Sequence, residues 1–135
     1  MIEYKKEENI SIEEFKEVLI NSTLGKRRPI HELERLSKMI EFGNLIITAR
    51  HNNKLIGIAR SLTDFAFCTY LSDIAVDEKY QKKGIGKELI RRTKLEAPMA
   101  KLILLAAPEA IPYYPKIGMR QYEFCYYLND IQDLL

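Results

Sequence analysis

The chain has 135 residues and a mass of 15.8 kDa, a length that suits one domain, so we expect a single domain over residues 1–135. A hydrophobic content of 47% and a charged content of 30% are those of a globular protein and argue against a disordered chain. The formal net charge of +2 is too small to indicate a nucleic-acid partner by itself.

The sequence also argues against a membrane protein, a secreted scaffold and a zinc site. No apolar run approaches the roughly 20 residues needed to cross a bilayer, and the N-terminus lacks the basic-then-apolar layout of a signal peptide. Cys68 and Cys125 are far apart, with no CxxC spacing and no nearby histidine pair. This pattern fits buried, reduced thiols. We therefore expect a cytoplasmic protein that uses no metal and has no membrane partner.

The first part of the chain predicts a strand and two helices. Residues 2–6 alternate between apolar and polar side chains, which is typical of a strand. Ser11 followed three residues later by Glu14 forms a capping box, which predicts a helix reaching about residue 21. After a break at a glycine and a proline, a second apolar stripe predicts another helix that ends at Gly43.

From residue 44 the apolar period changes to two, as expected for strands. Residues 45–50 and 54–62 predict a hairpin around the polar turn 51–53. Residues 67–76 predict a further strand, and residues 84–97 have the spacing of an amphipathic helix. This part of the chain is therefore expected to form an antiparallel meander followed by a helix.

The C-terminal part predicts a strand, a short helix and a last strand. Residues 101–107 are continuously apolar, a pattern typical of a strand covered on both faces. A short helix over about residues 109–116 is closed by Gly118, and residues 121–128 predict the last strand. A meander followed by a βαβ crossover implies an α/β (α+β) fold in which a mixed sheet is flanked by helices.

The most informative segment is the loop that leads into the helix predicted for residues 84–97. Gly84 and Gly86 lie at the start of this helix. The first amides of a helix have no internal partner and lie at the positive end of its dipole. Glycines there let an anion approach the backbone closely, and Lys82, Lys83 and Lys87 add positive charge. The loop is therefore predicted to bind a phosphate or a pyrophosphate.

Two common phosphate-binding motifs do not fit this loop. A Walker A loop needs a glycine at position 81 and Ser or Thr at position 88, where the chain has Gln81 and Glu88. A dinucleotide-binding fingerprint needs a third glycine at position 89, which is Leu89. Both motifs are therefore excluded.

The pattern that fits is Q-x-x-G-x-G, formed by Gln81, Gly84 and Gly86 behind a strand that ends Ile-Ala-Val. It resembles the acyl-CoA-binding motif of the GCN5-related N-acetyltransferases (GNAT). Residues 113–119, Y-Y-P-K-I-G-M, are similar to a second family segment, with Met119 in place of an aromatic residue. The resemblance covers nearly the whole chain. It implies a GNAT fold with a central, mixed, mostly antiparallel sheet of six to seven strands, splayed at the acetyl-CoA site and flanked by about four helices.

The resemblance also implies how the cofactor binds. The pantetheine arm would hydrogen-bond the backbone at the end of the strand, and the main-chain amides of residues 82–87 would hold the pyrophosphate. Gln81 would order the turn, and Lys82 or Lys83 would reach the 3′-phosphate. The residues expected to bind acetyl-CoA are Ile74, Ala75, Val76, Gln81, Lys82, Lys83, Gly84, Ile85, Gly86 and Lys87.

Acyl transfer to an amine needs a donor to the oxyanion and an acid for the leaving thiolate. Tyr114 aligns with the tyrosine that the family commonly uses as this acid, and the backbone N–H of Val76 or its neighbour is the candidate oxyanion donor. A phenol suits the role because its ordinary pKa of about 10 is close to that of a departing thiol. Tyr114 is therefore the expected catalytic residue.

Some family features are missing. Ala107 stands where many members have a cofactor-binding asparagine, and Tyr70 stands where some have a glutamate base. No general base is recognisable. Asp73, Glu109 and His31 are weak candidates beside an ordered water or deprotonation of the amine in bulk solvent.

The resemblance implies direct transfer of an acetyl group from acetyl-CoA to a primary amine of a small molecule or peptide. Two alternatives remain, a catalytically silent acyl-CoA binder and a nucleic-acid-binding module that uses the basic residues of 79–94. Arg27 and Arg28 either recognise an acidic group of the acceptor or are ordinary loop charges. The aromatic residues of 121–128 either line the acceptor pocket or form a homodimer interface.

Overall fold

The computed structural model describes all 135 residues, and their contacts divide the chain into two units, residues 1–105 and residues 106–135. The first unit contains the sheet, its helices and the glycine turn. The second unit contains short helical segments joined by irregular chain. No helix in either unit is both long enough and apolar enough to cross a bilayer.

One sheet of five strands forms the centre of the first unit, and the strands lie in the order in which the chain makes them. The strands are β1 (Ile2–Lys6), β2 (Leu45–His51), β3 (Lys54–Thr63), β4 (Cys68–Val76) and β5 (Lys101–Ile103). The first three pairings are antiparallel, whereas β4 and β5 are parallel. The expected mixed, mostly antiparallel sheet is confirmed, with five strands in place of six to seven.

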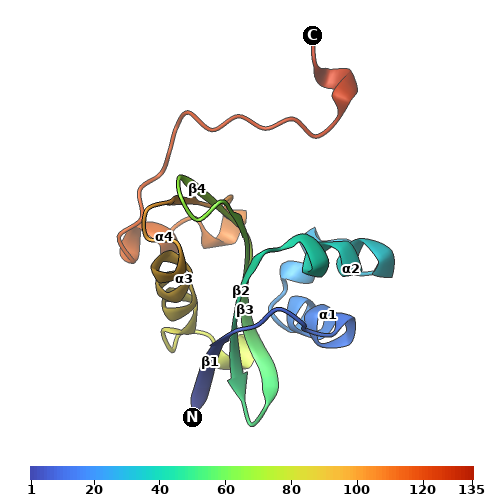
Figure 1. Ribbon diagram of the computed structural model, residues 1–135, viewed down its shortest axis with the longest axis vertical. Coiled ribbons are helices and arrows are strands. Elements are labelled where there is room, and N and C mark those ends of the chain that lie inside the picture. Colours follow the sequence, from blue (N-terminus) through green and yellow to red (C-terminus); the bar gives the residue numbers. More distant parts are fainter. The chain divides into compact units, whose positions relative to one another are not determined.

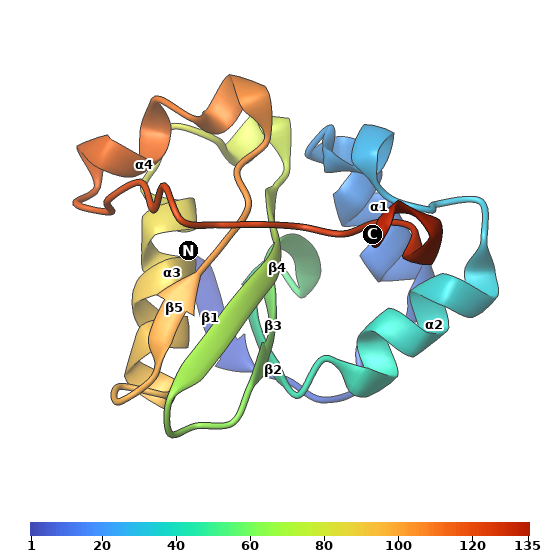
Figure 2. The same cartoon turned by 90° about the horizontal axis from the view of Figure 1, so that it is seen from above.

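Helices cover both faces of this sheet (Figures 1 and 2). Helices α1 (Ile12–Asn21) and α2 (Leu33–Phe42) lie on one face, and α3 (Ile85–Glu96) lies on the other. Two separate groups of buried side chains fill the two interfaces. Phe15 and Leu19 pack with Ile58 on the first face, while Ile85 and Leu89 pack with strand residues on the second. With α4 (Tyr113–Lys116) of the second unit, the four expected helices are present.

Local signals in the sequence place several boundaries correctly. Ser11 Oγ accepts a hydrogen bond from the Glu14 N–H at 3.1 Å, and Glu14 Oε2 accepts from the Ser11 N–H at 2.9 Å, so the capping box that starts α1 is confirmed. The turn between β2 and β3 has Asn52 and Asn53 at φ 49° and 68°. Asparagine adopts this left-handed conformation more readily than most residues, which explains the tight hairpin.

The prediction for residues 101–107 is wrong in length and in burial. β5 ends at Ile103, because pairing with β4 ends there. Leu102 and Leu104 pack against the core beneath α3, but Ile103 and Leu105 alternate to the other face and are 46% and 56% exposed. The continuous apolar run therefore marks a strand with one covered face.

The prediction of a last strand over residues 121–128 is also wrong. This segment pairs with no other strand, and its aromatic side chains are exposed. An alternating pattern gives a strand two faces, but the strand forms only where a neighbouring edge bonds its N–H and C=O groups. Cys125 in this segment and Cys68 at the start of β4 are both exposed and free, so the expectation of buried thiols is wrong.

Short helical turns replace the single helix expected over residues 109–116. They are η3 (Pro108–Ala110) and α4 (Tyr113–Lys116), and a third turn, η4 (Ile131–Asp133), lies near the C-terminus. Pro112 precedes α4 and interrupts the run. Gly118 has φ 96° and its N–H bonds the Pro115 carbonyl at 3.1 Å, so Gly118 closes α4 as expected.

A buried arginine lies at the register shift between β2 and β3, next to the β2–β3 turn. The Arg50 guanidinium donates to both oxygens of Glu7, at 2.8 and 3.0 Å, and to Glu14 at 2.9 Å. Partial burial works to raise the pKa of each carboxyl, but the bonds and charge of Arg50 outweigh it and each pKa lies below its ordinary value. We call Glu7, Glu14 and Arg50 the hairpin cluster; it ties α1 to the sheet.

Candidate functional site

The last part of β4 has an open edge. Along Thr69–Val76 this strand is paired with β3, whereas β5 pairs only with Cys68–Tyr70. Beyond Tyr70 one edge of β4 has no neighbouring strand, and the sheet is splayed there as expected. An extended ligand that carries amides is suited to such an edge, because it can take the place of the missing strand.

A bulge determines which backbone groups face the open edge. Arg60 is opposite Asp73 and Ser61 is opposite Leu71, so Ser72 is an extra residue in β4. The Asp77 N–H bonds the Ile56 carbonyl at 2.8 Å, which fixes the alternation beyond the bulge. Asp73 and Ala75 therefore direct their N–H and C=O groups to β3. The groups of Ile74 and Val76 point to the open edge.

A buried group of charges surrounds this bulge. The Arg28 and Arg60 Nε atoms donate to the two carboxylate oxygens of Asp73, whose side chain is fully buried. Arg28 also donates to the Ser72 carbonyl at 2.7 Å, and Arg60 donates to Ser72 Oγ at 3.0 Å. We call Arg28, Arg60 and Asp73 the bulge cluster; it holds the extra residue from two sides.

The turn after β4 is fastened to the sheet. Gln81 Nε2 donates to the Val76 carbonyl at 2.9 Å, and the Tyr80 hydroxyl, in η2 (Glu78–Tyr80), lies 2.7 Å from His51 Nδ1 at the end of β2. Lys82 and Gly84 then adopt φ 64° and 82°. A Cβ on Gly84 would meet no atom within 4 Å, so backbone conformation, rather than space, favours glycine there.

The first turn of α3 offers unpaired backbone donors. The first hydrogen bond within this helix joins the Glu88 N–H to the Gly84 carbonyl at 3.1 Å, so the amides of Ile85, Gly86 and Lys87 precede the helical ladder. Lys82, Lys83 and Lys87 are exposed around them. This geometry can bind a diphosphate through main-chain amides with mobile positive charge nearby.

Glu88 is the one acidic residue in the first turn of α3, and its charge is matched by arginines. Its carboxylate accepts hydrogen bonds from Arg91 and Arg92 at 2.7 Å. These bonds, above all the one from Arg91, lower the pKa of Glu88 to about 2. The carboxylate is therefore paired and directed toward the following turn of the helix.

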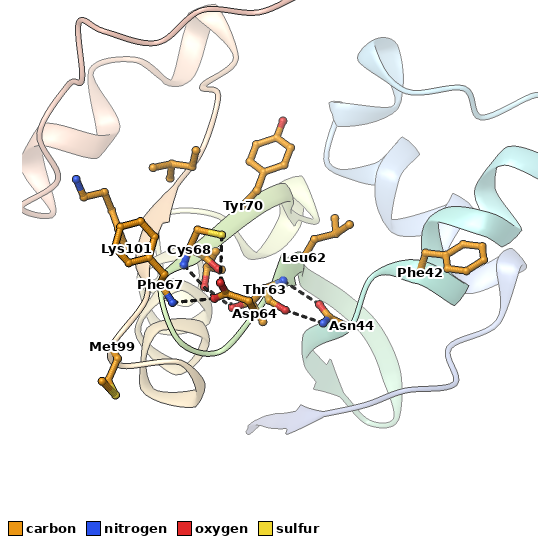
Figure 3. A pocket seen from close by; sticks show the side chains of 12 residues that line it. Phe42, Asn44, Leu62, Thr63, Asp64, Phe67, Cys68, Tyr70, Met99 and Lys101 are labelled. Atoms are coloured by element: carbon orange, nitrogen blue, oxygen red, sulfur yellow. Dashed lines mark hydrogen bonds between the residues drawn. The ribbon is translucent and has the colours of Figure 1, made fainter.

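A cavity of about 880 Å³ lies at the other end of β4 (Figure 3). Its wall is mainly apolar and includes Phe42, Leu62, Phe67, Tyr70, Met99 and Ile103. Asp64, also on the wall, accepts the N–H groups of Phe67, Ala66 and Cys68, and these bonds lower its pKa to about 2. Tyr70 and Ile103 are the last paired residues of β4 and β5, so the cavity adjoins the place where the open edge begins.

The ten residues predicted to bind the cofactor all belong to the first unit. They follow the end of β4, the turn and the start of α3. Ala75 differs from Ile74 and Val76, because its backbone faces β3. Tyr114 belongs to the second unit, so its meeting with the cofactor stays a prediction. Burial, followed by the neighbouring Tyr113, raises the pKa of the Tyr114 phenol above 10.0.

The weak candidates for a base gain little from the structure. Asp73 has both oxygens occupied by arginines and is inaccessible. His31 and Glu109 are exposed. Arg28 is committed to Asp73 and Ser72, whereas Arg27 beside it is exposed.

Sequence reasoning missed Arg60, Ser72 and the cavity. The sequence does contain a signal for Arg60, because Arg60 and Asp73 are opposite charges within two apolar strand segments. Charged side chains at such positions are buried only in pairs. No comparable signal marks the cavity, because its wall comes from several separate elements.

Comparison with known proteins identifies the class to which this fold and site belong. The family described as Acetyltransferase (GNAT) domain matches residues 3–131. The chain therefore belongs to the GNAT acetyltransferase family, which confirms the resemblance seen in the sequence.

Solved structures share this fold. A GNAT family acetyltransferase from Streptococcus pneumoniae superposes with a TM-score of 0.78 at 20% identity, covering 96% of this chain and 98% of that one. A predicted acetyltransferase from Clostridium acetobutylicum, solved with acetyl-CoA, superposes with a TM-score of 0.68 at 20% identity and covers 96% of each chain.

Curated relatives match parts of longer proteins. GCN5-related N-acetyltransferase 2, chloroplastic, from Arabidopsis thaliana is 33% identical over 72 residues, which are 51% of this chain and 28% of that protein. The uncharacterized N-acetyltransferase ycf52 of Pyropia yezoensis is 29% identical over 115 residues, which are 82% of this chain and 65% of that protein. The chain thus spans less than two thirds of the length of these relatives.

Proposed function

We propose that residues 1–135 act as one N-acetyltransferase domain that moves an acetyl group from acetyl-CoA directly to a primary amine of a small molecule or peptide. The observation that carries this proposal is the open edge of β4, which one turn joins to the free amides of α3. The two features are matched to the two halves of the cofactor, an amide-bearing arm and a diphosphate.

The backbone would bind most of the cofactor. Ile74 offers both its N–H and its C=O to the pantetheine amides. Gln81 already occupies the Val76 carbonyl, so Val76 offers its N–H alone, and this N–H is left for the thioester carbonyl. Ala75 sets the spacing between them. The amides of residues 82–87 hold the diphosphate, and Lys82 or Lys83 reaches the 3′-phosphate. The N-acetyltransferase names of the relatives and the neighbour solved with acetyl-CoA support this co-substrate.

The reaction then forms a C–N bond and breaks the thioester C–S bond. A neutral amine attacks the carbonyl carbon, and the N–H of Val76 donates to the oxygen that becomes negative. The sulfur leaves with the bonding electrons and takes a proton from the Tyr114 hydroxyl. The attacking nitrogen gives up its extra proton as the amide forms, and a proton returned through solvent restores the Tyr114 phenol. A raised pKa suits Tyr114, because the phenol keeps its proton through the neutral range. No metal and no acyl-enzyme are needed.

The apolar cavity at the start of the open edge is our candidate for the acceptor site. It adjoins Tyr70, where some family members would have a base, and the structure offers no carboxylate at that position. The amine therefore loses its proton to water.

The exposed aromatic residues of 121–128 are available for a homodimer, and the exposed free cysteines fit a reducing cytoplasm.

Release of the CoA thiol in the presence of an amine panel tests the proposal. The panel comprises ethanolamine, putrescine, lysine, tyramine and a short peptide, and the thiol is detected colorimetrically. We expect amine-dependent thiol release. Cofactor binding without release with any amine would support a silent acyl-CoA binder, and salt-sensitive nucleic-acid binding that CoA does not compete away would support a nucleic-acid module.

Gly86→Glu tests the cofactor site itself. The new carboxylate stands among amides meant for a diphosphate, so we expect CoA affinity measured by calorimetry to fall by at least about 100-fold. Lys38→Gln, an equal change of charge on the exposed face of α2, is the matched control and is expected to bind as the wild type does. If the Gly86 variant kept the wild-type CoA affinity, this turn would not be the diphosphate site.

Tyr114→Phe tests the acid. We expect turnover to fall by about 10- to 100-fold, because a general acid contributes at least that much, while CoA affinity stays close to wild type. The wild type should lose turnover as the pH rises above 10, where the phenol loses its proton. The variant should lack this alkaline loss. Equal turnover in the two proteins would exclude Tyr114.

A further inference from the structure

The bulge at Ser72 has a consequence for the open edge of β4. If Ser72 were paired with Arg60 rather than bulged, the pairing seen at Ser61 and Leu71 would continue unchanged, and every later residue of β4 would shift by one position. Ile74 and Val76 would then direct their N–H groups to β3, and Ala75 would face the open edge. The bulge therefore selects which two residues meet an extended ligand.

Two arginine side chains from two separate segments hold this bulge. Arg28, between α1 and α2, bonds the Ser72 carbonyl and the Asp73 carboxylate, so it grips both the extra residue and the next one. Arg60 on β3 bonds the same carboxylate, Ser72 Oγ and the Met39 carbonyl at the end of α2. The planar guanidinium groups set these directions, since the N–H groups of each lie in the plane of the group's three nitrogens at fixed angles to one another.

The chain makes room for this arrangement. A Cβ on Gly43 would lie 2.9 Å from Arg60 Cγ and 2.9 Å from the Met39 carbonyl oxygen, closer than real Cβ contacts. Gly43 has an ordinary extended backbone with φ −77°, so the absence of a side chain serves the passage of Arg60. The position that ends α2 is thus fitted to the bulge cluster.

We propose that Arg28 and Arg60 are positioning residues for acyl transfer: through Asp73 and Ser72 they hold the bulge that directs the Ile74 and Val76 amides to the cofactor. The proposal rests on the proposed function. It assigns Asp73 a role as the shared acceptor of both arginines. It also gives the segment between α1 and α2 a link to the cofactor-binding strand that involves no contact with either substrate.

Amide hydrogen exchange measured by NMR on the full chain tests this without activity. In the wild type, Ile74 and Val76 should exchange rapidly and Ala75 and Asp77 slowly, and acetyl-CoA should slow the first pair. In Arg28→Gln we expect the protection of Ala75 and Asp77 to fall by about tenfold more than that of amides shared by β2 and β3. If Arg28 only stabilised the fold, Arg28→Gln would lower the protection of all these amides by the same factor.

Kinetics supplies the second readout, with the best amine of the panel as acceptor. We expect Arg28→Gln to lower kcat by about tenfold through misplaced donors. CoA affinity should change by no more than about threefold, because the turn that holds the diphosphate is untouched and only the pantetheine contacts are disturbed. Arg28→Lys keeps the positive charge but loses the planar guanidinium. Relative to Arg28→Gln, it should restore a larger share of the wild-type thermal stability than of the wild-type kcat. Arg35→Gln, on an exposed ion pair with Glu32 of 3.2 Å, is the matched control.

Three results would overturn the proposal: a common loss of protection across the sheet, a kcat equal to that of the Arg35 control, or a loss of CoA affinity as large as that of kcat. If Arg28→Gln does not fold, Arg28→Lys and Ser72→Ala are measured by the same criteria. If the wild type does not bind acetyl-CoA, the proposed function fails, whereas the exchange pattern of the free protein still decides whether Arg28 holds the bulge.

Discussion

The two register shifts of the sheet each have a buried arginine beside them, but they differ in their surroundings. The hairpin cluster lies where β2 and β3 turn back on each other, and β2 is paired on both sides there. The bulge cluster lies beside β4, whose other edge is free beyond Tyr70. The same chemistry therefore fastens a helix in one place and directs unpaired backbone groups in the other.

Burial separates the clusters further. The Asp73 side chain is 0% exposed, whereas the side chains of Glu7 and Glu14 are 20% and 29% exposed. A fully buried carboxylate that loses a partner has no water to replace it, while a half-buried one has some. The bulge cluster is thus the costlier arrangement, and it stands where the direction of two amides matters.

The matched variants Arg60→Met and Arg50→Met test this difference and carry the largest expected effects. We expect Arg60→Met to lower the free energy of unfolding by about 3–5 kcal/mol, because Asp73 stays buried with one partner. Arg50→Met should lower it by about 1–3 kcal/mol, because water reaches Glu7 and Glu14. Urea unfolding at pH 7 measures both values.

Turnover under conditions in which both variants are folded completes the comparison. Arg60→Met should lose turnover well beyond its loss of folded protein, whereas Arg50→Met should keep the wild-type value per folded molecule. Equal turnover in the two variants would mean that both clusters serve only the fold. A larger loss in Arg50→Met would reverse their roles.

The parts of the fold that sequence predicted correctly depend on neighbouring residues. The Ser11–Glu14 capping box and the Asn52–Asn53 turn each involve contacts within a few positions, so their patterns are visible in the chain. The failures depend on distant partners. Residues 121–128 have the pattern of a strand but no edge to pair with. Residues 101–107 are apolar throughout, so their sequence does not show which side chains α3 covers.

The candidate site divides in the same way. The diphosphate turn is made by the backbone of one contiguous segment, so its glycines and lysines revealed it. The bulge cluster joins Arg28 to a carboxylate 45 positions away, and Arg60 to the same group 13 positions away. Charge type and apolar context could suggest that these residues are buried in pairs, but they do not specify which pairs form or that a bulge lies between them.

The acid stability of the hairpin cluster gives the smallest expected effect. In the folded protein the pKa values of Glu7 and Glu14 lie below their ordinary value of 4.5. A carboxyl of this kind stabilises the fold above its unfolded pKa and loses that contribution as the pH falls through its folded pKa. The wild type should therefore lose stability below about pH 4.5, by less than about 1 kcal/mol from this source because the carboxyls are partly solvated.

Arg50→Met removes the bonds and charge that lower both pKa values, so its stability should fall less steeply over the same acid range. Urea unfolding midpoints measured between pH 6 and pH 3 give the slope of stability against pH for the wild type and for Arg50→Met. The other carboxyls of the chain titrate in the same range and contribute to both slopes. Lys54→Gln, in the same hairpin and in an exposed pair with Glu17 of 3.4 Å, should follow the wild-type slope. Parallel curves for the wild type and Arg50→Met would show that Arg50 stabilises the hairpin by packing rather than by charge.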